Sequence, residues 1–475
     1  METQLAVIGG GPGGYAAAFL AADLGMEVTL IEQEPRLGGV CLLRGCIPSK
    51  ALLHVAKVLA EAEHLQPWGV HFPKPTVDLA ALRQQKEKII STLSGGLKQI
   101  ASRRKVDRIE ARAAFLDNHT LQLEPVSDRS PPEDRLRFAH CIVATGSRPL
   151  LPKTLQGTGD RVWDSTAALE LLEIPKTLLV VGGGYIGLEM GAVYAALGSR
   201  VTVVEMTDGL LPGVDRDLVR PLQKRLETLF EAILLRTQVT ALTDRGDHVE
   251  VVLQSTDGQT HSQAFDRVLA AVGRRPNTEN LGLERTKVQL TEQGFIQGDA
   301  QRRTAEPTIY AIGDVAGQPM LAHKAAREGK VAVEAIAGRP VEFRPRAIPA
   351  VVFTDPEIAW VGLTETEAHV QSRRIETAVF PWAASGRALS MGRTEGMTKW
   401  IVDPETERVL GCGIVGAGAG DLIGEAALAV ELGCHLEDVA ETIHPHPTLC
   451  ETLSLAAEVY YGTATDLYKP RKKSI

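Results

Sequence analysis

Residues 5–14 read Leu-Ala-Val-Ile-Gly-Gly-Gly-Pro-Gly-Gly, an apolar run typical of a strand that leads directly into a glycine-rich turn. An alanine-rich segment follows, and a second apolar run, 28–31, ends at an acidic residue. This order predicts a strand, a tight turn, a helix and a second strand, the arrangement that binds a dinucleotide. The turn lets a pyrophosphate approach the backbone, the helix amino terminus favours its charge, and the acid accepts a ribose hydroxyl. The residues predicted to form this site are Gly9, Gly11, Gly14 and Glu32.

The same pattern occurs a second time farther along the chain. The apolar run 178–181 leads into another glycine-rich turn, and the run 201–204 again ends at an acidic residue. Each key glycine and the acid are displaced by the same 173 residues. One such fingerprint is weak evidence, but two in constant register predict two dinucleotide sites. The second site is expected to use Gly182, Gly184, Gly187 and Glu205, together with Gly273, because 268–276 echoes 141–149.

Residues 38–50, between the two fingerprints, read Gly-Gly-Val-Cys-Leu-Leu-Arg-Gly-Cys-Ile-Pro-Ser-Lys. The two cysteines, Cys41 and Cys46, are five positions apart, close enough to form a disulfide. A crosslink over so short a loop adds little stability, and the glycines keep bulk away from the sulfurs, which favours redox chemistry over a structural bridge. From the spacing alone, two ordinary reduced cysteines or half of a zinc site remain equally open.

Several motifs together resemble the flavoprotein disulfide reductases, the class I pyridine nucleotide-disulfide oxidoreductases, and within them the branch that oxidises dihydrolipoyl groups. These motifs are GGVCLLRGCIPSK at 38–50, ATGSRP at 144–149, GGGYIGLE at 182–189, AIGDV at 311–315 and HPHPTLCE at 444–451. The resemblance implies an α/β protein with two Rossmann-like dinucleotide-binding domains, one for FAD and one for NAD, and an α+β C-terminal dimerisation domain. The implied parts are an FAD-binding domain with the redox disulfide (1–148), an NAD-binding domain (149–273), a segment returning to the FAD domain (274–346) and the dimerisation domain (347–475).

The resemblance also implies roles for individual residues. Cys41 and Cys46 would form the redox disulfide, with Cys41 exchanging with the substrate and Cys46 lying nearer the flavin. Lys50 would pair with Glu189 beside the reactive nitrogen of the flavin. The further FAD contacts implied are Lys50, Thr145, Gly146, Asp314 and Ala322; Tyr185 is added to the NAD site, and no metal is expected.

His446 and Glu451 can act as a catalytic base and the carboxylate that orients it. A His and a Glu at this spacing are usually only exposed residues, but beside a redox dithiol they favour a catalytic function. Only a thiolate attacks a disulfide, so a dihydrolipoyl thiol needs a base. In the family this histidine reaches across the two-fold axis of a homodimer, and the bond from His446 to Pro447 is cis.

Four residues depart from the family pattern, namely Val40, Leu43, Arg44 and Tyr185. They leave the electron donor open between the lipoyl arm of a 2-oxoacid dehydrogenase complex, a glycine-cleavage carrier and a specialised lipoate-binding protein, such as one serving sulfur oxidation. A glutathione-type reductase would use NADPH and need basic residues after Glu205, where Met-Thr-Asp follows. A mercuric reductase would end in a cysteine pair, whereas this chain ends Lys-Lys-Ser-Ile. A subunit kept only for docking would not need an intact set of catalytic residues.

Composition bounds the answer independently. A chain of 475 residues is too long for one core, and its 44% hydrophobic and 23% charged residues are typical of a globular protein. The net charge of −8 disfavours nucleic acid as a partner, and the basic end 469–473 is interpreted as a solvated tail. With no signal peptide and no apolar stretch approaching ~18 residues, we expect no membrane association and a cytoplasmic location. Strands are expected at 113–123 and 137–144, with a hairpin tip at 127–134.

Overall fold

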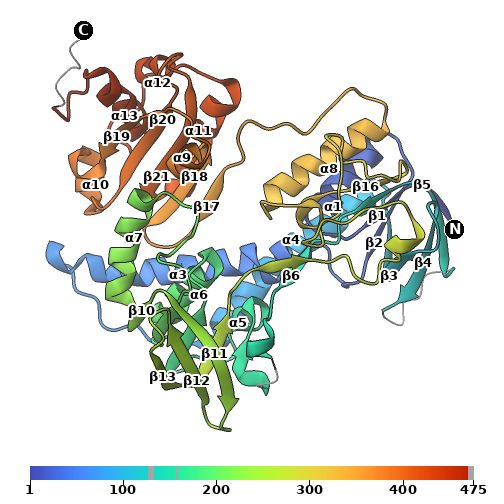
Figure 1. Ribbon diagram of the computed structural model, residues 1–475, viewed down its shortest axis with the longest axis horizontal. Coiled ribbons are helices and arrows are strands. Elements are labelled where there is room, and N and C mark those ends of the chain that lie inside the picture. Colours follow the sequence, from blue (N-terminus) through green and yellow to red (C-terminus); the bar gives the residue numbers. More distant parts are fainter. Residues whose placement is uncertain (127–132, 157–158, 469–475) are drawn as a thin grey trace.

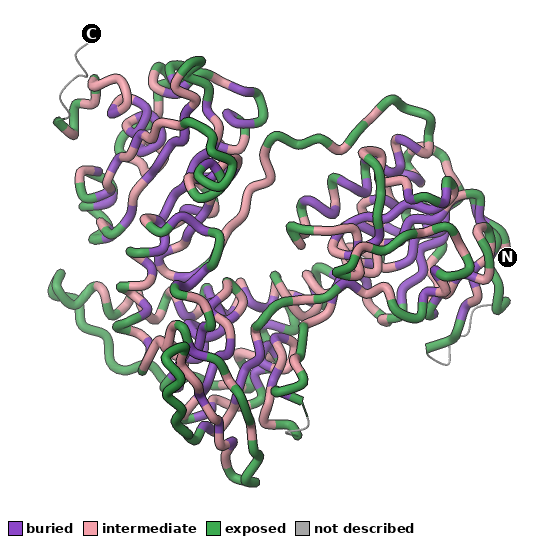
Figure 2. Tube along the Cα trace, in the orientation of Figure 1, coloured by how far each residue is buried: buried purple, intermediate pink, exposed green. Residues whose placement is uncertain are grey.

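The computed structural model describes residues 1–126, 133–156 and 159–468. These residues form three lobes, with the amino terminus in one and the carboxyl-terminal region in another (Figure 1). Buried residues gather inside each lobe, and long exposed segments run between them (Figure 2). Most of the expected hairpin tip at 127–134, and the basic tail at 469–473, lie outside the described residues.

The first lobe is built around a sheet of mostly parallel strands. Its strand β3 also begins an antiparallel meander that continues through β4 to β5. Residue pairs such as Leu5 with Val28 and Val7 with Ile142 fix the register of this sheet. The first half of β3 runs parallel to β2, and its second half pairs antiparallel with β4. The strands are β1 (Glu2–Ile8), β2 (Val28–Glu32), β3 (Asp107–Phe115), β4 (Thr120–Pro125), β5 (Arg135–Val143) and β16 (Ile309–Ala311).

The expected strand at 113–123 is wrong, because the chain turns between β3 and β4. The carboxylate of Asp117 accepts a hydrogen bond from the backbone N–H of His119 at 2.7 Å. Asp and Asn form such local turns readily, so Asp117 and Asn118 were a signal for this break.

The segment after residue 273 returns to the first lobe through β16 and α8 (Ala322–Ile336). Helix α8 packs on α1 (Pro12–Asp23), and the contact is as close as two backbones allow. A Cβ at Gly329 would lie 2.7 Å from the carbonyl oxygen of Gly13, nearer than any real Cβ. A glycine is therefore required where the two helices cross.

The second lobe contains a five-stranded parallel sheet in the order β10-β9-β8-β14-β7. Helix α6 (Tyr185–Ala196) crosses from β8 to β9, and α7 (Arg216–Leu229) leads to β10. The strands are β7 (Val162–Trp163), β8 (Thr177–Val181), β9 (Arg200–Val204), β10 (Ala232–Leu234) and β14 (Arg267–Ala270). A meander of β11 (Thr237–Asp244), β12 (Val249–Ser255) and β13 (Thr260–Phe265) is attached, and β6 (Ser147–Pro149) pairs with β15 (Arg274–Pro276) where the chain passes between lobes.

The third lobe is an antiparallel sheet in the order β17-β18-β21-β20-β19 with helices packed against it. Its strands are β17 (Ala350–Val352), β18 (Glu357–Gly362), β19 (Glu376–Pro381), β20 (Met397–Val402) and β21 (Val409–Gly416). Its helices are α9 (Glu365–Val370), α10 (Gly386–Met391), α11 (Ala419–Leu432), α12 (Leu436–Glu441) and α13 (Glu451–Tyr461). Two lobes with parallel strands at their centres, and a third with an antiparallel sheet and helices, agree with the fold class expected from the sequence.

One helical run is more apolar than the sequence analysis allowed. Residues 39–68 contain α2 (Gly39–Arg44), α3 (Cys46–His64) and a short 3-10 turn, and by length and composition this run could cross a membrane. In the structure part of this run packs inside the protein, because Leu52 and Leu53 are buried in the core of the second lobe. Helix α3 packs against α6 there and so joins the first two lobes, and it also contacts α4 (Leu79–Arg103).

Candidate functional site

The two glycine-rich loops have the same geometry. Gly9 has a φ of +106° and Gly182 a φ of +111°, a region that other residues rarely adopt. A Cβ at Gly14 would lie 1.8 Å from the carbonyl oxygen of Gly9, and one at Gly187 would lie 2.2 Å from that of Gly182. The repeated glycines are therefore needed for the turn and for close packing of helix on strand.

The acid at the end of each second strand holds its own glycine loop. Glu32 accepts a hydrogen bond from the backbone N–H of Gly10 at 2.6 Å, and Glu205 accepts one from Gly183 at 2.7 Å. Both carboxylates are buried, and burial raises the pKa of Glu32 despite these bonds. Each acid thus lies beside the loop it was predicted to serve.

A cavity of about 1350 Å³ opens between the first and second lobes. It extends from Glu32, past the first glycine loop, to the two cysteines and Asp314. At its wall Gly39 faces Gly11 so closely that a Cβ at Gly39 would lie 2.6 Å from the Gly11 Cα. An elongated cavity with a bare-backbone cradle fits a dinucleotide such as FAD. The predicted residues that line it are Gly9, Gly11, Glu32, Cys41, Cys46, Lys50, Thr145, Gly146, Tyr185, Glu189, Asp314 and Ala322.

The other predicted residues lie elsewhere. Gly14 is buried behind the first loop, and Gly182, Gly184, Gly187 and Glu205 form the second loop. Gly273 connects β14 to β15 and accepts a hydrogen bond from the backbone N–H of Leu150. Tyr185, expected in the NAD site, begins α6 beside the second loop and also lines the first cavity, so it lies between the two sites.

Both cysteines are free thiols, so the disulfide expected from the sequence is not formed in this structure. The two side chains lie close together, and a hydrogen bond between the thiols shifts the acidity of each. Gly45 brings them together where α2 ends and α3 begins. A Cβ at Gly45 would lie 2.8 Å from the carbonyl oxygen of Val40, so only glycine permits this close approach.

The two thiols have opposite acidities. The hydrogen bond with Cys41, supported by the Lys50 ammonium, lowers the pKa of Cys46 to about 7 against the effect of burial. The same hydrogen bond, together with burial, raises the pKa of Cys41. Cys46 is therefore the thiol of the pair that loses its proton first.

This assignment predicts a titration of the reduced holoenzyme. The pKa of Cys46 is lowered, so its thiolate is present above pH ~7 and is lost as the pH falls through that value. Long-wavelength absorbance from a thiolate beside the flavin should follow this midpoint. Lys50→Met removes the stabilising charge and should raise the midpoint by about one unit. Lys57→Met, on the same helix but paired with Glu357, should leave it in place; an equal shift in both variants would contradict the assignment.

Lys50 and Glu189 meet at the junction of all three lobes. The Lys50 ammonium lies 2.8 Å from a carboxylate oxygen of Glu189, which is 4% exposed. The other oxygen of Glu189 accepts a hydrogen bond from the backbone N–H of Phe353 at 3.0 Å. The ammonium also lies 4.4 Å from the centre of the Phe353 ring, within the range of a cation–π interaction. Nothing in the sequence indicated Phe353, which directly follows β17 in the third lobe.

Asp314 belongs to a second network that the sequence analysis missed. It accepts a hydrogen bond from the Ser147 hydroxyl at 2.6 Å, and Arg274 donates to the same hydroxyl at 2.8 Å. The signal was present, because Ser147 and Arg274 occupy the two segments that echo each other, and those segments pair as β6 and β15.

His446 and Glu451 form the expected pair at the surface of the third lobe. The two are joined at 2.7 Å, from His446 Nδ1 to a Glu451 oxygen, and the second oxygen accepts from the backbone N–H of Thr448 at 2.6 Å. The His446 side chain is 79% exposed, and neither residue lines the cavity that contains the cysteines. The peptide bond from His446 to Pro447 is cis, as the family resemblance implied.

Comparisons with known proteins identify the same architecture. The family model described as pyridine nucleotide-disulphide oxidoreductase matches residues 3–329, and its dimerisation domain matches 348–457. The chain is 48% identical to a dihydrolipoyl dehydrogenase of Haemophilus influenzae and 47% identical to one of Vibrio cholerae, each over 100% of this chain and 98% of the relative. It is also similar to the solved structure of LpdA from Mycobacterium tuberculosis (29% identity, TM-score 0.88, covering 96% of this chain and 99% of that one) and to RclA, an HOCl-induced flavoprotein disulfide reductase of Escherichia coli (28%, 0.83, 95% and 98%).

Proposed function

The chain belongs to the pyridine nucleotide-disulphide oxidoreductases and is a dihydrolipoyl dehydrogenase that uses FAD and NAD, and we propose that it takes electrons from the dihydrolipoyl group of a carrier protein at a site shared by two subunits. The observation that carries this proposal is that the catalytic residues lie in two separate places. The redox thiols lie in the cavity, whereas the base that a dithiol substrate needs lies exposed on the dimerisation domain.

The thiol chemistry is an exchange of disulfides. A thiolate of the substrate attacks Cys41 in the oxidised pair, the bond to Cys46 breaks, and Cys46 leaves as a thiolate. The second substrate thiol then attacks the mixed disulfide, which closes the lipoyl ring and releases Cys41 as a thiol. Two electrons pass from the substrate to the cysteine pair. The lowered pKa of Cys46 makes it the better leaving group, because thiolates of low pKa leave faster.

The base in this exchange is His446. Its Nδ1 is held by Glu451, so its Nε2 is left to take the proton of a substrate thiol. Because the side chain is exposed and does not line its own subunit's cavity, we assign it to the cysteine pair of the partner subunit.

The residues that line the cavity would hold FAD, which would supply the chemistry that takes the electron pair from the cysteine pair and passes it as hydride to NAD. The chain's own residues prepare this step. Lys50 keeps a positive charge next to Cys46 and the cavity, and Glu189, fixed by the Phe353 backbone, keeps Lys50 in place. Glu189 is buried, so the position of the Lys50 charge is fixed before the reaction begins.

The carrier can be identified by kinetics with the purified holoenzyme. Free dihydrolipoamide and NAD give the basal rate, and three lipoylated carriers are then compared at matched concentrations. They are the lipoyl domain of a 2-oxoacid dehydrogenase complex, a glycine-cleavage carrier and a specialised lipoate-binding protein. A physiological carrier should raise kcat/KM well above the value for free dihydrolipoamide, because contacts with the carrier protein contribute binding energy that the free compound lacks. If none does so, a protein-bound donor is not the substrate.

The second loop predicts strong preference for NAD over NADP. Glu205 presents a buried carboxylate whose oxygens accept from Gly183 and Thr207, so a 2′-phosphate would meet negative charge that cannot move away. We expect kcat/KM to be higher for NAD by about 100-fold or more. Glu205→Gln should lower the ratio of kcat/KM for NAD to that for NADP. Asp208→Asn, at an exposed acid nearby, should leave this ratio unchanged. Similar constants for the two nucleotides would refute this role.

A further inference from the structure

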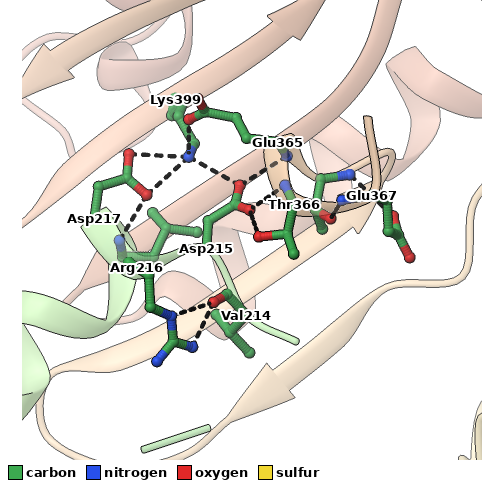
Figure 3. Close-up of polar contacts among 10 residues, drawn as sticks. Val214, Asp215, Arg216, Asp217, Glu365, Thr366, Glu367 and Lys399 are labelled. Atoms are coloured by element: carbon green, nitrogen blue, oxygen red, sulfur yellow. Dashed lines mark hydrogen bonds and ion pairs between the residues drawn. The ribbon is translucent and has the colours of Figure 1, made fainter. Parts of the chain in front are cut away.

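Lys399 is a fully buried lysine that the reaction does not use. Its ammonium contacts three carboxylates, Asp215 at 2.9 Å, Asp217 at 2.8 and 2.9 Å, and Glu365 at 2.5 Å (Figure 3). Burial works against its charge, but the hydrogen bonds to Asp217 and Glu365 raise the pKa of Lys399 above its ordinary value. Three carboxylates this close could hold a metal ion, but the ammonium occupies the position between them.

The side chains of β20 divide between two neighbours, because alternate residues of a strand face opposite sides. Thr398 bonds the hydroxyl of Thr452 at 2.8 Å, and the Trp400 indole donates to the carbonyl of Leu453 at 2.8 Å. Both therefore face α13, the helix that begins at Glu451. Lys399, between them, faces the other way, toward α7 of the NAD-binding domain.

The cluster fastens the start of α7 to the dimerisation domain. Asp215 directly precedes α7, where its side chain would ordinarily cap that helix, yet it makes no cap bond there. It instead accepts hydrogen bonds from the backbone N–H groups of Glu365 and Thr366, at 3.1 and 3.0 Å, at the start of α9. Asp217 lies in the first turn of α7. Lys399 therefore closes a contact between two domains.

From this anchor a continuous chain of contacts reaches the nucleotide loop. Arg216, between the two anchored acids, donates to the carbonyls of Leu210 at 2.7 Å and Leu211 at 2.6 Å, and also to that of Val214 (Figure 3). The backbone N–H of Leu211 donates to the carbonyl of Gly183 at 2.9 Å. The Leu210 side chain packs so closely that a Cβ at Gly183 would lie 2.8 Å from it.

We propose that Lys399 is a positioning residue for NAD: by holding the start of α7 against the dimerisation domain, it fixes the turn 210–214 and, through that turn, the Gly183 segment of the pyrophosphate-binding loop. Loss of the ammonium would leave three carboxylates facing one another without a cation. They would separate, α7 would move from the dimerisation domain, and the nucleotide loop would lose its support. The bonds from β20 to α13 would remain.

The test compares the two halves of the reaction in the FAD-loaded holoenzyme. Lys399→Met keeps most of the side-chain length and removes the charge. We expect calorimetric titration with NAD to show binding about fivefold weaker, with a matching rise in the KM for NAD. Reduction by dihydrolipoamide in the absence of NAD should keep its wild-type rate. Lys399→Arg, which retains a cation, should restore part of the affinity.

A matched control separates positioning from stability. Arg393 is also a buried cation of the dimerisation domain, and it bonds Asp355 and Glu395 in its own domain. Arg393→Met should lower the free energy of unfolding without weakening the binding of NAD. If the Lys399→Met protein does not fold, Asp217→Asn removes one contact of the same cluster and should weaken the binding of NAD to a smaller degree. NAD binding of wild-type strength in the folded Lys399 or Asp217 variant would overturn the proposal, as would equal damage to the dihydrolipoamide half.

Discussion

Replacing Cys46 with serine should abolish oxidation of dihydrolipoamide by NAD, with turnover reduced by about 1000-fold or more, while FAD stays bound. A hydroxyl cannot form the disulfide that the substrate reduces, and it cannot supply a thiolate at neutral pH. The cavity changes little, because serine is similar in size to cysteine and the substitution leaves the glycine cradle and Glu32 unaltered. The variant should also lack the long-wavelength absorbance of the two-electron-reduced enzyme.

A cysteine outside the cavity provides the control. Cys434 lies in the dimerisation domain, where its backbone bonds Val409 and Ala429, and it does not line the cavity. Cys434→Ser should retain turnover and the long-wavelength absorbance. A Cys46→Ser protein that kept either property would show that another residue is the thiolate beside the flavin.

The nucleotide loops were predictable because their chemistry is local. A turn that admits a pyrophosphate needs glycine at fixed offsets, and the repeated offsets of Gly9 and Gly182 reveal two such turns without any knowledge of packing. The cysteine pair was predictable for the same reason, since Gly45 and five residues of chain suffice to bring the thiols together. The family motifs then supplied the partner of Lys50, which lies 139 residues away.

Contacts between domains were not predictable in this way. Phe353 supports Glu189 through its backbone N–H, which any residue other than proline would provide, so its side chain carries no signal. Lys399 is 184 residues from Asp215, and a lysine in a strand is ordinarily expected to be exposed. Its burial depends on three acids that meet only when α7, α9 and β20 are assembled. Such long-range pairing leaves no periodicity in the sequence.

Heterodimers should reveal that each active site is shared. A Cys46→Ser chain and a His446→Gln chain should each be inactive as a homodimer, because every site then lacks either the thiolate or the base. In a mixed dimer one site receives both lesions. The other combines the intact Cys46 of one chain with the intact His446 of its partner, and this site should work.

Random pairing makes about half of the dimers mixed, each with one working site of two, so roughly a quarter of wild-type activity should return under a closed two-fold assembly. The two chains must be co-expressed with different affinity tags, and sequential purification on both tags isolates the mixed species, which should show about half of wild-type activity per dimer. Tagged wild-type dimers control for losses during purification. The shared site follows from the exposure of His446 on the dimerisation domain, away from the cavity of its own chain. If purified heterodimers were no more active than either parent, His446 would have to serve its own subunit, and the third lobe would have to move toward the cysteines during turnover.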